Sequence, residues 1–389
     1  MITFKPLSNP ILFVSDNPSL FGGLSRLCRD VATLTCTLPQ FRVGVLGRGL
    51  GNRRKLPFII YDYDESGGWG QNYLQPAWED FSGGEPGIVF TLDDPSRRHW
   101  MVNPIGMPQK LQEFLNEPTF KRWGHFPIDS TGPNGTTLSW AGRDCASRFD
   151  RTLATSEWGC NVLKRGGLSS ADWLPHGILD VFHPMPKAKE LLGWEGRVVV
   201  GCVMTNQSRK DWPAAFECFR TLRNHYGSKF LPWIHIDRAV NYWDINQLAV
   251  DYDMQDIEVT LALNDDQLAL RYSGCSATIL PSAGEGFGYP IAESLACGTA
   301  CITTDYAAGQ EIVPEDCRVR PVAFHVETAH NVLRAILSGH GFAQKVIPQV
   351  EKKQEDWEYR SVELQASVDY LQWNNLKHPW TRWLLEGLR

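Results

Sequence analysis

The sequence predicts an α/β fold with two domains, each built on a parallel sheet. Its 389 residues are more than one domain of ordinary size usually holds. Short apolar runs of strand length alternate along the chain with segments that have helical spacing. One run, residues 197–203, is apolar almost throughout, as expected of a strand in a parallel sheet that helices cover on both faces.

In the first half, five apolar runs are expected to form strands. They end in loops that carry polar and aromatic side chains, and open α/β sheets bind ligands at this end of their strands. Trp69 and Trp100 lie in such loops, where they could stack on a sugar or a base, or pack a loop against the sheet. The predicted strands are residues 11–14, 41–46, 58–61, 87–91 and 123–128, and residues 24–34 are a predicted helix that opens at Gly22-Gly23.

In the second half, the strand at 197–203 runs into a loop that holds Arg209 and Lys210 just before a predicted helix. Cations at a helix N-terminus oppose the helix dipole, which favours a functional reason for them. The other predicted elements are a strand at 233–237, a helix at 263–272, helices at 326–337 and 345–371, and a short amphipathic helix at 378–388.

Residues 281–305, PSAGEGFGYPIAESLACGTACITTD, are the most informative stretch. A predicted strand at 277–280 leads into a glycine-rich turn, then into a helix at 291–297 with Pro290 in its first turn, then into a strand at 300–303. Such a turn directs backbone N–H groups and a helix N-terminus to one point, which suits a bound phosphate. Glu285 and Glu293 flank this point, where carboxylates can meet sugar and ribose hydroxyls.

Composition narrows the class of protein. Hydrophobic content of 43% and charged content of 21% are typical of a soluble globular protein, and no apolar run approaches the ~20 residues of a membrane span. The N-terminus lacks the features of a signal peptide, and none of the ten cysteines forms a C-x-x-C pair. We therefore expect a cytoplasmic protein with reduced, mostly buried thiols.

The charge distribution disfavours a general nucleic-acid binder. Residues 1–185 carry 18 basic and 18 acidic side chains, and the remainder carries 20 basic and 26 acidic ones. Local basic clusters at residues 53–55 and 97–98 keep nucleic-acid contact open for the first half. Two D-x-D sequences, at 62–64 and 251–253, are interpreted as chance, so no obligatory metal is expected.

The stretch from 281 to 305 resembles the E-x7-E motif of retaining GT-B glycosyltransferases, most closely of glycosyltransferase family 4. Three further segments are similar to family segments: GHFPIDS at 124–130, DWLPHGILDVFHP at 172–184 and TNQSRKDW at 205–212. One position departs from the pattern. Many members carry an arginine five positions before the lysine, and this chain has Thr205 there.

The resemblance implies a GT-B fold of two Rossmann-like domains that face a central cleft. It places an acceptor-binding domain at 1–184, a donor-binding domain at 185–372, and a C-terminal helix at 373–389 that packs back on the first domain. It also implies transfer of a sugar from a nucleotide-sugar to an acceptor hydroxyl, with retention of the anomeric configuration and without an obligatory cofactor.

The resemblance further assigns candidate site residues. The candidate catalytic residues are Glu285, Lys210, Arg209, His125 and Asp129. The candidate donor-binding residues are Gly23, Asn206, Arg209, Lys210, Gly286, Phe287, Gly288, Tyr289 and Glu293. The candidate acceptor-binding residues are Trp69, Arg97, Arg98 and Trp100, while His176 is expected to hold the linker.

The partners remain open at this point. The acceptor could be a saccharide, a lipid or a small molecule, or a hydroxylated base of DNA flipped out of the helix. Two other functions also fit the architecture: a nucleotide-sugar epimerase and a non-catalytic binder of sugar nucleotides. The sequence does not name the nucleotide, the sugar or the acceptor.

Overall fold

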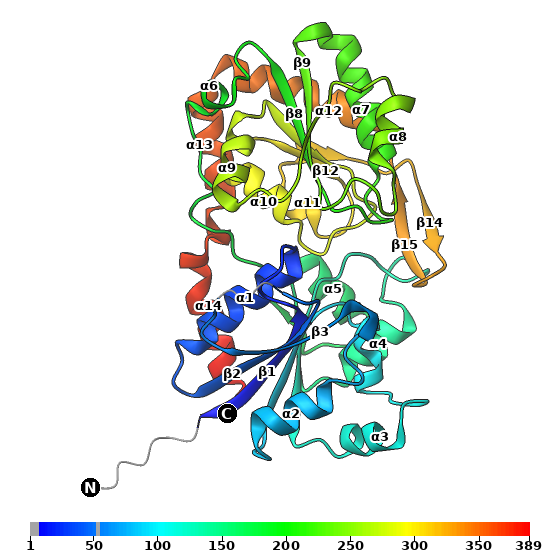
Figure 1. Cartoon of the computed structure of the whole chain (residues 1–389). Helices are drawn as coiled ribbons and strands as arrows, with labels where there is room; N and C mark the ends of the chain where they lie inside the picture. Colours follow the sequence, from blue (N-terminus) through cyan, green and yellow to red (C-terminus); the bar gives the residue numbers. More distant parts are fainter. Residues whose placement is uncertain (1–7, 52–54) are drawn as a thin grey trace, which may run out of the picture. The chain divides into compact units, whose positions relative to one another are not determined.

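The computed structural model describes residues 8–51 and 55–389. The chain divides into two compact units, and the predicted fold class is confirmed, since each unit is an α/β domain around a parallel sheet (Figure 1). The first unit comprises residues 1–177, 329–332 and 376–389, and the second comprises residues 178–328 and 333–375.

The first unit has a seven-stranded sheet in the order β3-β2-β1-β4-β5-β6-β7, with every neighbouring pair parallel. The strand order reverses between β1 and β4, so right-handed crossovers place helices on both faces. The strands are β1 (Asn9–Asp16), β2 (Phe41–Arg48), β3 (Ile59–Tyr63), β4 (Gly87–Leu92), β5 (Phe120–Phe126), β6 (Arg151–Ala154) and β7 (Asp172–Trp173). The helices are α1 (Gly23–Cys36), α2 (Leu74–Ser82), α3 (Gln109–Asn116), α4 (Trp140–Ser147) and α5 (Glu157–Arg165).

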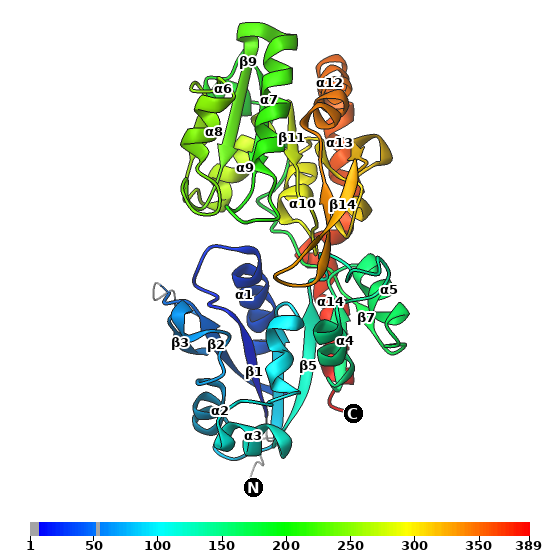
Figure 2. The same cartoon turned by 90° about the vertical axis from the view of Figure 1, so that its right-hand side faces the viewer.

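The C-terminal helix α14 (Trp373–Glu386) returns to the first unit, as predicted. Its Trp383 ring lies 5.4 Å from the ring of Phe90 and 5.2 Å from that of Trp123, between centroids. Arg151 donates a hydrogen bond of 2.6 Å to the carbonyl of Trp383. Apolar rings from β4 and β5 thus bury one face of this helix, and Figure 2 shows α14, in red, beside β5.

The second unit has a six-stranded sheet in the order β10-β9-β8-β11-β12-β13, again with all pairs parallel. The strands are β8 (Val198–Val203), β9 (Phe230–His235), β10 (Glu258–Thr260), β11 (Ala277–Leu280), β12 (Cys301–Thr304) and β13 (Arg318–Val319). The helices are α6 (Ala188–Leu192), α7 (Trp212–Tyr226), α8 (Ile245–Asp251), α9 (Asp265–Gly274), α10 (Tyr289–Ala296), α11 (Gly309–Ile312), α12 (Gly339–Glu355) and α13 (Trp357–Ser367).

The prediction of a helix at residues 326–337 is wrong. These residues form most of a β-hairpin, β14 (Ala323–Glu327) and β15 (Val332–Ile336). Asn331 has a φ of 52°, a left-handed conformation that Asn tolerates and that turns the chain between the two strands. The apolar spacing of so short a segment fits a strand as well as a helix, so the turn decides between them.

The helix predicted at 345–371 is divided. It breaks at Asp356, whose side chain accepts a hydrogen bond from the backbone N–H of Tyr359 and so caps the N-terminus of α13. Among residues 8–51 and 55–389, no helix combines the length and the apolarity needed to cross a membrane.

Candidate functional site

Three loops of the second unit meet at the carboxyl ends of β8, β11 and β12. The N–H of Ala283 donates to the carbonyl of Arg209 over 2.8 Å, and the N–H of Asp211 donates to that of Pro281 over 2.9 Å. The N–H of Ala308, after β12, donates to the carbonyl of Glu285 over 3.0 Å. These backbone bonds fix the loop that holds Arg209 and Lys210 against the loop that holds Glu285.

Glu285 is the centre of a buried ion cluster. Its Oε1 forms an ion pair with Nζ of Lys210 and lies 3.3 Å from Nη1 of Arg209. The side chains of Lys210 and Glu285 are less than a tenth exposed, whereas that of Arg209 is 25% exposed. The structure therefore brings together the three candidate catalytic residues of the second unit.

In this cluster each charged side chain favours the charged form of its oppositely charged partner. Burial lowers the pKa of Lys210 to about 8, although the Glu285 carboxylate opposes that effect. Burial by itself would raise the pKa of Glu285, but the charges of Lys210 and Arg209 outweigh it and lower that pKa. At neutral pH the cluster thus holds two cations and one carboxylate, with a net positive charge that suits an anion.

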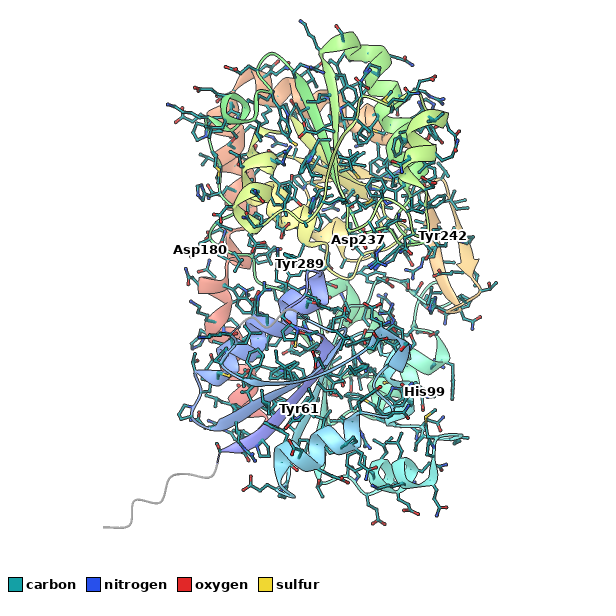
Figure 3. All side chains as sticks on the ribbon, viewed as in Figure 1. Tyr61, His99, Asp180, Asp237, Tyr242 and Tyr289 are labelled. Carbon is teal, nitrogen blue, oxygen red and sulfur yellow. The ribbon has the colours of Figure 1, made fainter. Side chains whose placement is uncertain are left out.

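One residue that the sequence did not single out, Trp243, holds the backbone of Lys210 in place. Trp243 donates its indole N–H to the carbonyl of Lys210 over 2.9 Å. Trp243 in turn is held by Asn206, which accepts from the N–H of Trp243 over 2.9 Å and donates to its carbonyl over 2.8 Å. The neighbouring residues Asp237 and Tyr242 are labelled in Figure 3 at this end of the second unit.

The predicted donor residue Asn206 is fully buried, and its amide is used inside the protein. Besides its bonds to Trp243, it donates to the carbonyl of Arg238 over 3.1 Å. The arrangement ties the loop after β8 to the loop after β9. No local pattern could have indicated this, because the partners lie more than 30 positions away.

The N-terminus of α10 lies in the loop after β11, as predicted. Gly288 caps the helix with a φ of 91°, a left-handed conformation that favours glycine. A Cβ built on Gly288 would lie 2.7 Å from Cδ1 of Ile291, so the end of that side chain would have to move. The side chains of Phe287 and Tyr289 are buried, which leaves the backbone of residues 286–289 as the part of this turn that suits an anion.

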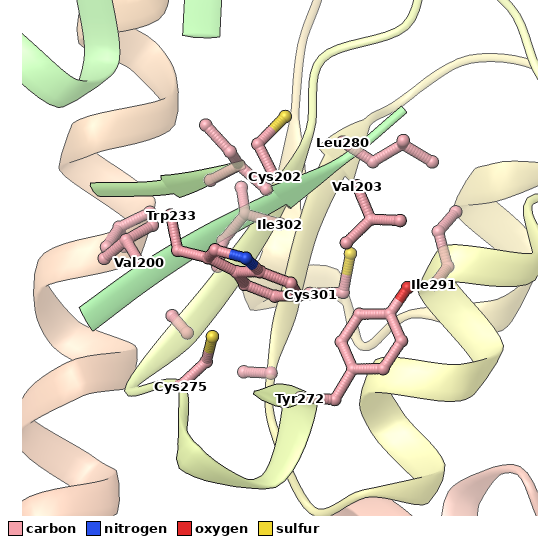
Figure 4. Close-up of a cluster of buried hydrophobic side chains, with 14 of the residues drawn as sticks. Val200, Cys202, Val203, Trp233, Tyr272, Cys275, Leu280, Ile291, Cys301 and Ile302 are labelled. Carbon is pink, nitrogen blue, oxygen red and sulfur yellow. The ribbon is translucent and has the colours of Figure 1, made fainter. Parts of the chain in front are cut away.

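Glu293 lies in the second turn of α10 and is only 2% exposed. The hydroxyl of Tyr272, on α9, donates to its Oε2 over 3.2 Å. Figure 4 shows the Tyr272 side chain reaching across the core toward Ile291 of α10. Burial, together with the charge of Glu293, raises the pKa of Tyr272, so its hydroxyl remains a donor to the carboxylate. The sequence around Tyr272 has ordinary helical spacing, and nothing in it indicates the contact with Glu293.

In the first unit, the candidate stacking surface of Trp69 is already occupied. The guanidinium carbons of Arg48 and Arg97 lie 4.3 and 4.4 Å from the centroid of its ring. Arg98 is fully buried, lies 2.7 Å from Asp93 in an ion pair, and donates to the carbonyl of Trp69. These contacts attach the loop around Trp69 to Arg48 at the end of β2 and to the loop after β4.

Two further candidates of the first unit are buried as well. Trp100 is 6% exposed, and His125, in β5, has no exposed surface. Nε2 of His125 lies 2.8 Å from the carbonyl of Leu174, and its ring centroid lies 5.6 Å from that of His176 and 5.0 Å from that of Trp380. Burial lowers the pKa of His125 to about 4, so this histidine is neutral at pH 7.

Carboxylates gather at the carboxyl ends of β1, β4 and β5. Burial raises the pKa of Asp94, and the charge of nearby Asp129 raises it further. Asp16, which is not among the sequence-predicted site residues, ends β1. Burial and then the charge of Asp93 raise its pKa to about 6, although Arg48 lies 4.0 Å away. Gly23 begins α1 on the loop after β1, as predicted.

Within the described ranges, no group of three or more His, Cys, Asp or Glu side chains is arranged to hold a metal ion. Of the basic cluster at 53–55, Arg53 and Arg54 lie outside the described residues, and Lys55 is exposed.

A protein-family model matches part of the chain. Residues 246–353, which include Glu285 and Glu293, match the family model described as "Glycosyl transferases group 1". No curated protein matches the chain.

Solved structures resemble the chain over almost its whole length. Sucrose-phosphate synthase from Thermosynechococcus elongatus is 13% identical, with a TM-score of 0.72 over 98% of this chain and 99% of that one. HepE from Anabaena is 12% identical, with a TM-score of 0.72 over 97% and 99%. A glycosyltransferase from Rickettsia africae is 16% identical, with a TM-score of 0.64 over 98% and 97%. At these identities the neighbours show the fold alone, which is of the GT-B type, and the family match covers residues 246–353 of this fold.

Proposed function

We propose that this protein transfers a sugar from a nucleotide-sugar to an acceptor hydroxyl with retention of the anomeric configuration. The observation that carries the proposal is the buried cluster of Lys210, Arg209 and Glu285 beside the N-terminus of α10. Solved neighbours add support for the donor class: HepE was crystallised with UDP-glucose, and an Escherichia coli protein was solved with UDP-2-fluoro glucose.

In this proposal the donor diphosphate binds to Lys210, Arg209 and the backbone N–H groups of residues 286–289. When the bond between the anomeric carbon and the phosphate oxygen breaks, negative charge grows on that oxygen. Cations and aligned N–H groups that are already in place stabilise this charge without reorganisation. Glu285 keeps Lys210 charged before the donor binds. When the donor is bound, the Glu285 carboxylate accepts hydrogen bonds from the sugar hydroxyls.

The Glu293 carboxylate accepts hydrogen bonds from the ribose hydroxyls, and the hydroxyl of Tyr272 holds that carboxylate in place. The acceptor oxygen attacks the anomeric carbon on the face from which the phosphate leaves. A new carbon–oxygen bond forms there, and the acceptor proton passes to the departing phosphate oxygen. Gly23 approaches the donor phosphate through its backbone, while Asn206 positions the loop after β8 instead of touching the donor.

We assign acceptor binding to the first unit and donor binding to the second. Trp69, Arg97 and Asp129 are partly exposed, whereas the other predicted residues of the first unit, Arg98, Trp100 and His125, are buried. The acceptor is a saccharide or another hydroxylated small molecule. Neither a DNA acceptor nor an epimerase activity is favoured by an observation on the described residues. We assign no obligatory metal or cofactor, and a cytoplasmic location.

A thermal-shift screen with UDP-, GDP-, ADP- and dTDP-sugars tests the proposal. Any molecule that binds only the folded protein raises the melting temperature. At least one donor should stabilise the wild type, and the shift should vanish in Lys210→Met. If no nucleotide-sugar stabilises the wild type, the proposed function is wrong.

A further inference from the structure

The β14–β15 hairpin is attached to the loops that form the candidate donor site. The N–H of Ala335, on β15, donates to the carbonyl of Ala283 over 3.1 Å, two positions before Glu285. The hydroxyl of Tyr306, on the loop after β12, donates to the carbonyl of Leu333 over 3.0 Å. The ring of Tyr306 also lies 5.0 Å from that of Phe324 on β14. Figure 1 shows the hairpin, in orange, on the flank of the second unit.

One carboxylate connects the hairpin to the loop that carries the cations. Glu327, at the end of β14, accepts a hydrogen bond of 2.9 Å from Nε of Arg334 on β15. The hydroxyl of Ser208, which directly precedes Arg209 and Lys210, donates to the other carboxylate oxygen of Glu327 over 3.4 Å. The hairpin therefore contacts the loops after β8, β11 and β12.

The charges on this connection have a direct consequence for an anionic ligand. A carboxylate beside a diphosphate site would repel the ligand if it were unpaired, and partial burial would strengthen that repulsion. The side chain of Glu327 is 19% exposed and that of Arg334 is 10% exposed. Arg334 neutralises Glu327, so that Glu327 can hold Ser208 without opposing an anion bound at Lys210.

We propose that Glu327 and Arg334 are positioning residues for the diphosphate site, and that the β14–β15 hairpin acts through Ser208 on the orientation of Arg209 and Lys210. The inference rests on the proposed function, because it presupposes that Lys210 and Arg209 bind the donor diphosphate. It adds a role for a segment whose residues neither the motif nor the family resemblance singled out.

Titration of UDP, GDP and ADP, followed by the matching nucleosides, tests this role in the full-length protein. For the diphosphate that binds tightest, Arg334→Gln should raise the Kd about tenfold, because the charge of Glu327 is then uncompensated. Arg334→Lys should restore most of the affinity. The double variant Glu327→Gln/Arg334→Gln should bind better than Arg334→Gln, because it removes the repelling charge. Nucleoside binding should stay as in the wild type in every variant.

Two further variants keep the test interpretable. Ser208→Ala removes only the exposed hydroxyl bond to Glu327, and it should weaken diphosphate binding about threefold even if the hairpin variants fold poorly. Arg223→Gln is the matched control, because it breaks an ion pair with Asp256 at the far end of α7. This control should bind the diphosphate as the wild type does.

The outcomes separate the two proposals. If Lys210→Met loses diphosphate binding while Arg334→Gln and Ser208→Ala keep it, the positioning role is wrong and the proposed function stands. An equal loss of diphosphate and nucleoside affinity in Arg334→Gln would also overturn the role, since it would indicate general disruption. If no diphosphate binds the wild type, both proposals fail.

Discussion

Lys210 and Glu285, which are 75 positions apart in the sequence, form an ion pair at the carboxyl edge of the second sheet. Both side chains are less than a tenth exposed, so neither charge is well solvated. The attraction between the two charges offsets part of the free-energy cost of burying them. Removal of either side chain leaves the other charge buried and unpaired. The pair therefore couples the stability of the second unit to the chemistry that we propose for it.

Lys210→Met should impair both activity and stability. Loss of a preorganised charge in the transition state lowers kcat by about a hundredfold, and breaking a buried pair costs about 3 kcal/mol. Transfer assays and denaturant unfolding measure the two effects. Lys352→Met is the matched control, because Lys352 pairs with Asp316 at the surface, where both side chains are almost half exposed. Its unfolding free energy and activity should change little. Near-normal transfer by Lys210→Met would remove Lys210 from the mechanism.

Glu293→Gln and Tyr272→Phe should both weaken donor binding, in that order of severity. The first removes the charge that we assign to the ribose hydroxyls, and the second removes only the hydrogen bond that orients it. We expect a rise in the donor KM of about thirtyfold and about fivefold, respectively, from the usual cost of such bonds. Tyr226→Phe, on α7, serves as the control and should leave KM unchanged. A donor KM equal to that of the wild type in Glu293→Gln would contradict the ribose assignment.

Gly288→Ala should lower donor affinity as well as the melting temperature. A side chain at a φ of 91° is strained by about 1–2 kcal/mol, and the new Cβ would displace Ile291 at the start of α10. Gly83→Ala is the control, with a φ of 62° and no heavy atom within 4 Å of the added Cβ. Both variants should melt earlier, but only Gly288→Ala should bind the diphosphate more weakly. Equal diphosphate affinity in the two variants would show that the turn does not form the binding site.

His125 should affect the pH dependence of stability and leave catalysis unchanged. Its pKa falls from 6.5 to about 4 on folding, so the unfolded chain binds more protons between these values. The stabilisation is complete above pH 6.5 and is lost as the pH falls toward 4, by as much as about 3 kcal/mol. Denaturation midpoints of the wild type and His125→Gln, measured from pH 7 to 4.5, should converge at low pH. Parallel curves, or a loss of kcat in His125→Gln, would contradict this account.

Much of the second unit can be predicted from the sequence, because the signals for its elements are local. The strand at 277–280, the glycine turn and the capped helix depend on neighbouring residues, and the structure has them where they were expected. The contacts of Glu285 with Lys210 and of Glu293 with Tyr272 cross 75 and 21 positions, so only the fold reveals them.

The first unit was less predictable for the same reason. Its loops are rich in Trp and Arg, and sequence alone cannot distinguish a side chain that faces a ligand from one that is buried. Trp69 is covered by two guanidinium groups, and Arg98 is used in a buried ion pair. The helix predicted at 326–337 is instead most of a hairpin, whose turn includes Asn331 in a left-handed conformation that apolar spacing does not reveal.

Calorimetric titration of a nucleoside diphosphate and its nucleoside into wild type and Lys210→Met tests the central claim most directly. The account predicts that the diphosphate binds the wild type at least tenfold more tightly than it binds Lys210→Met, and that the nucleoside binds both equally. Equal affinity of the diphosphate for the two proteins would show that the cluster of Lys210, Arg209 and Glu285 does not bind the donor diphosphate.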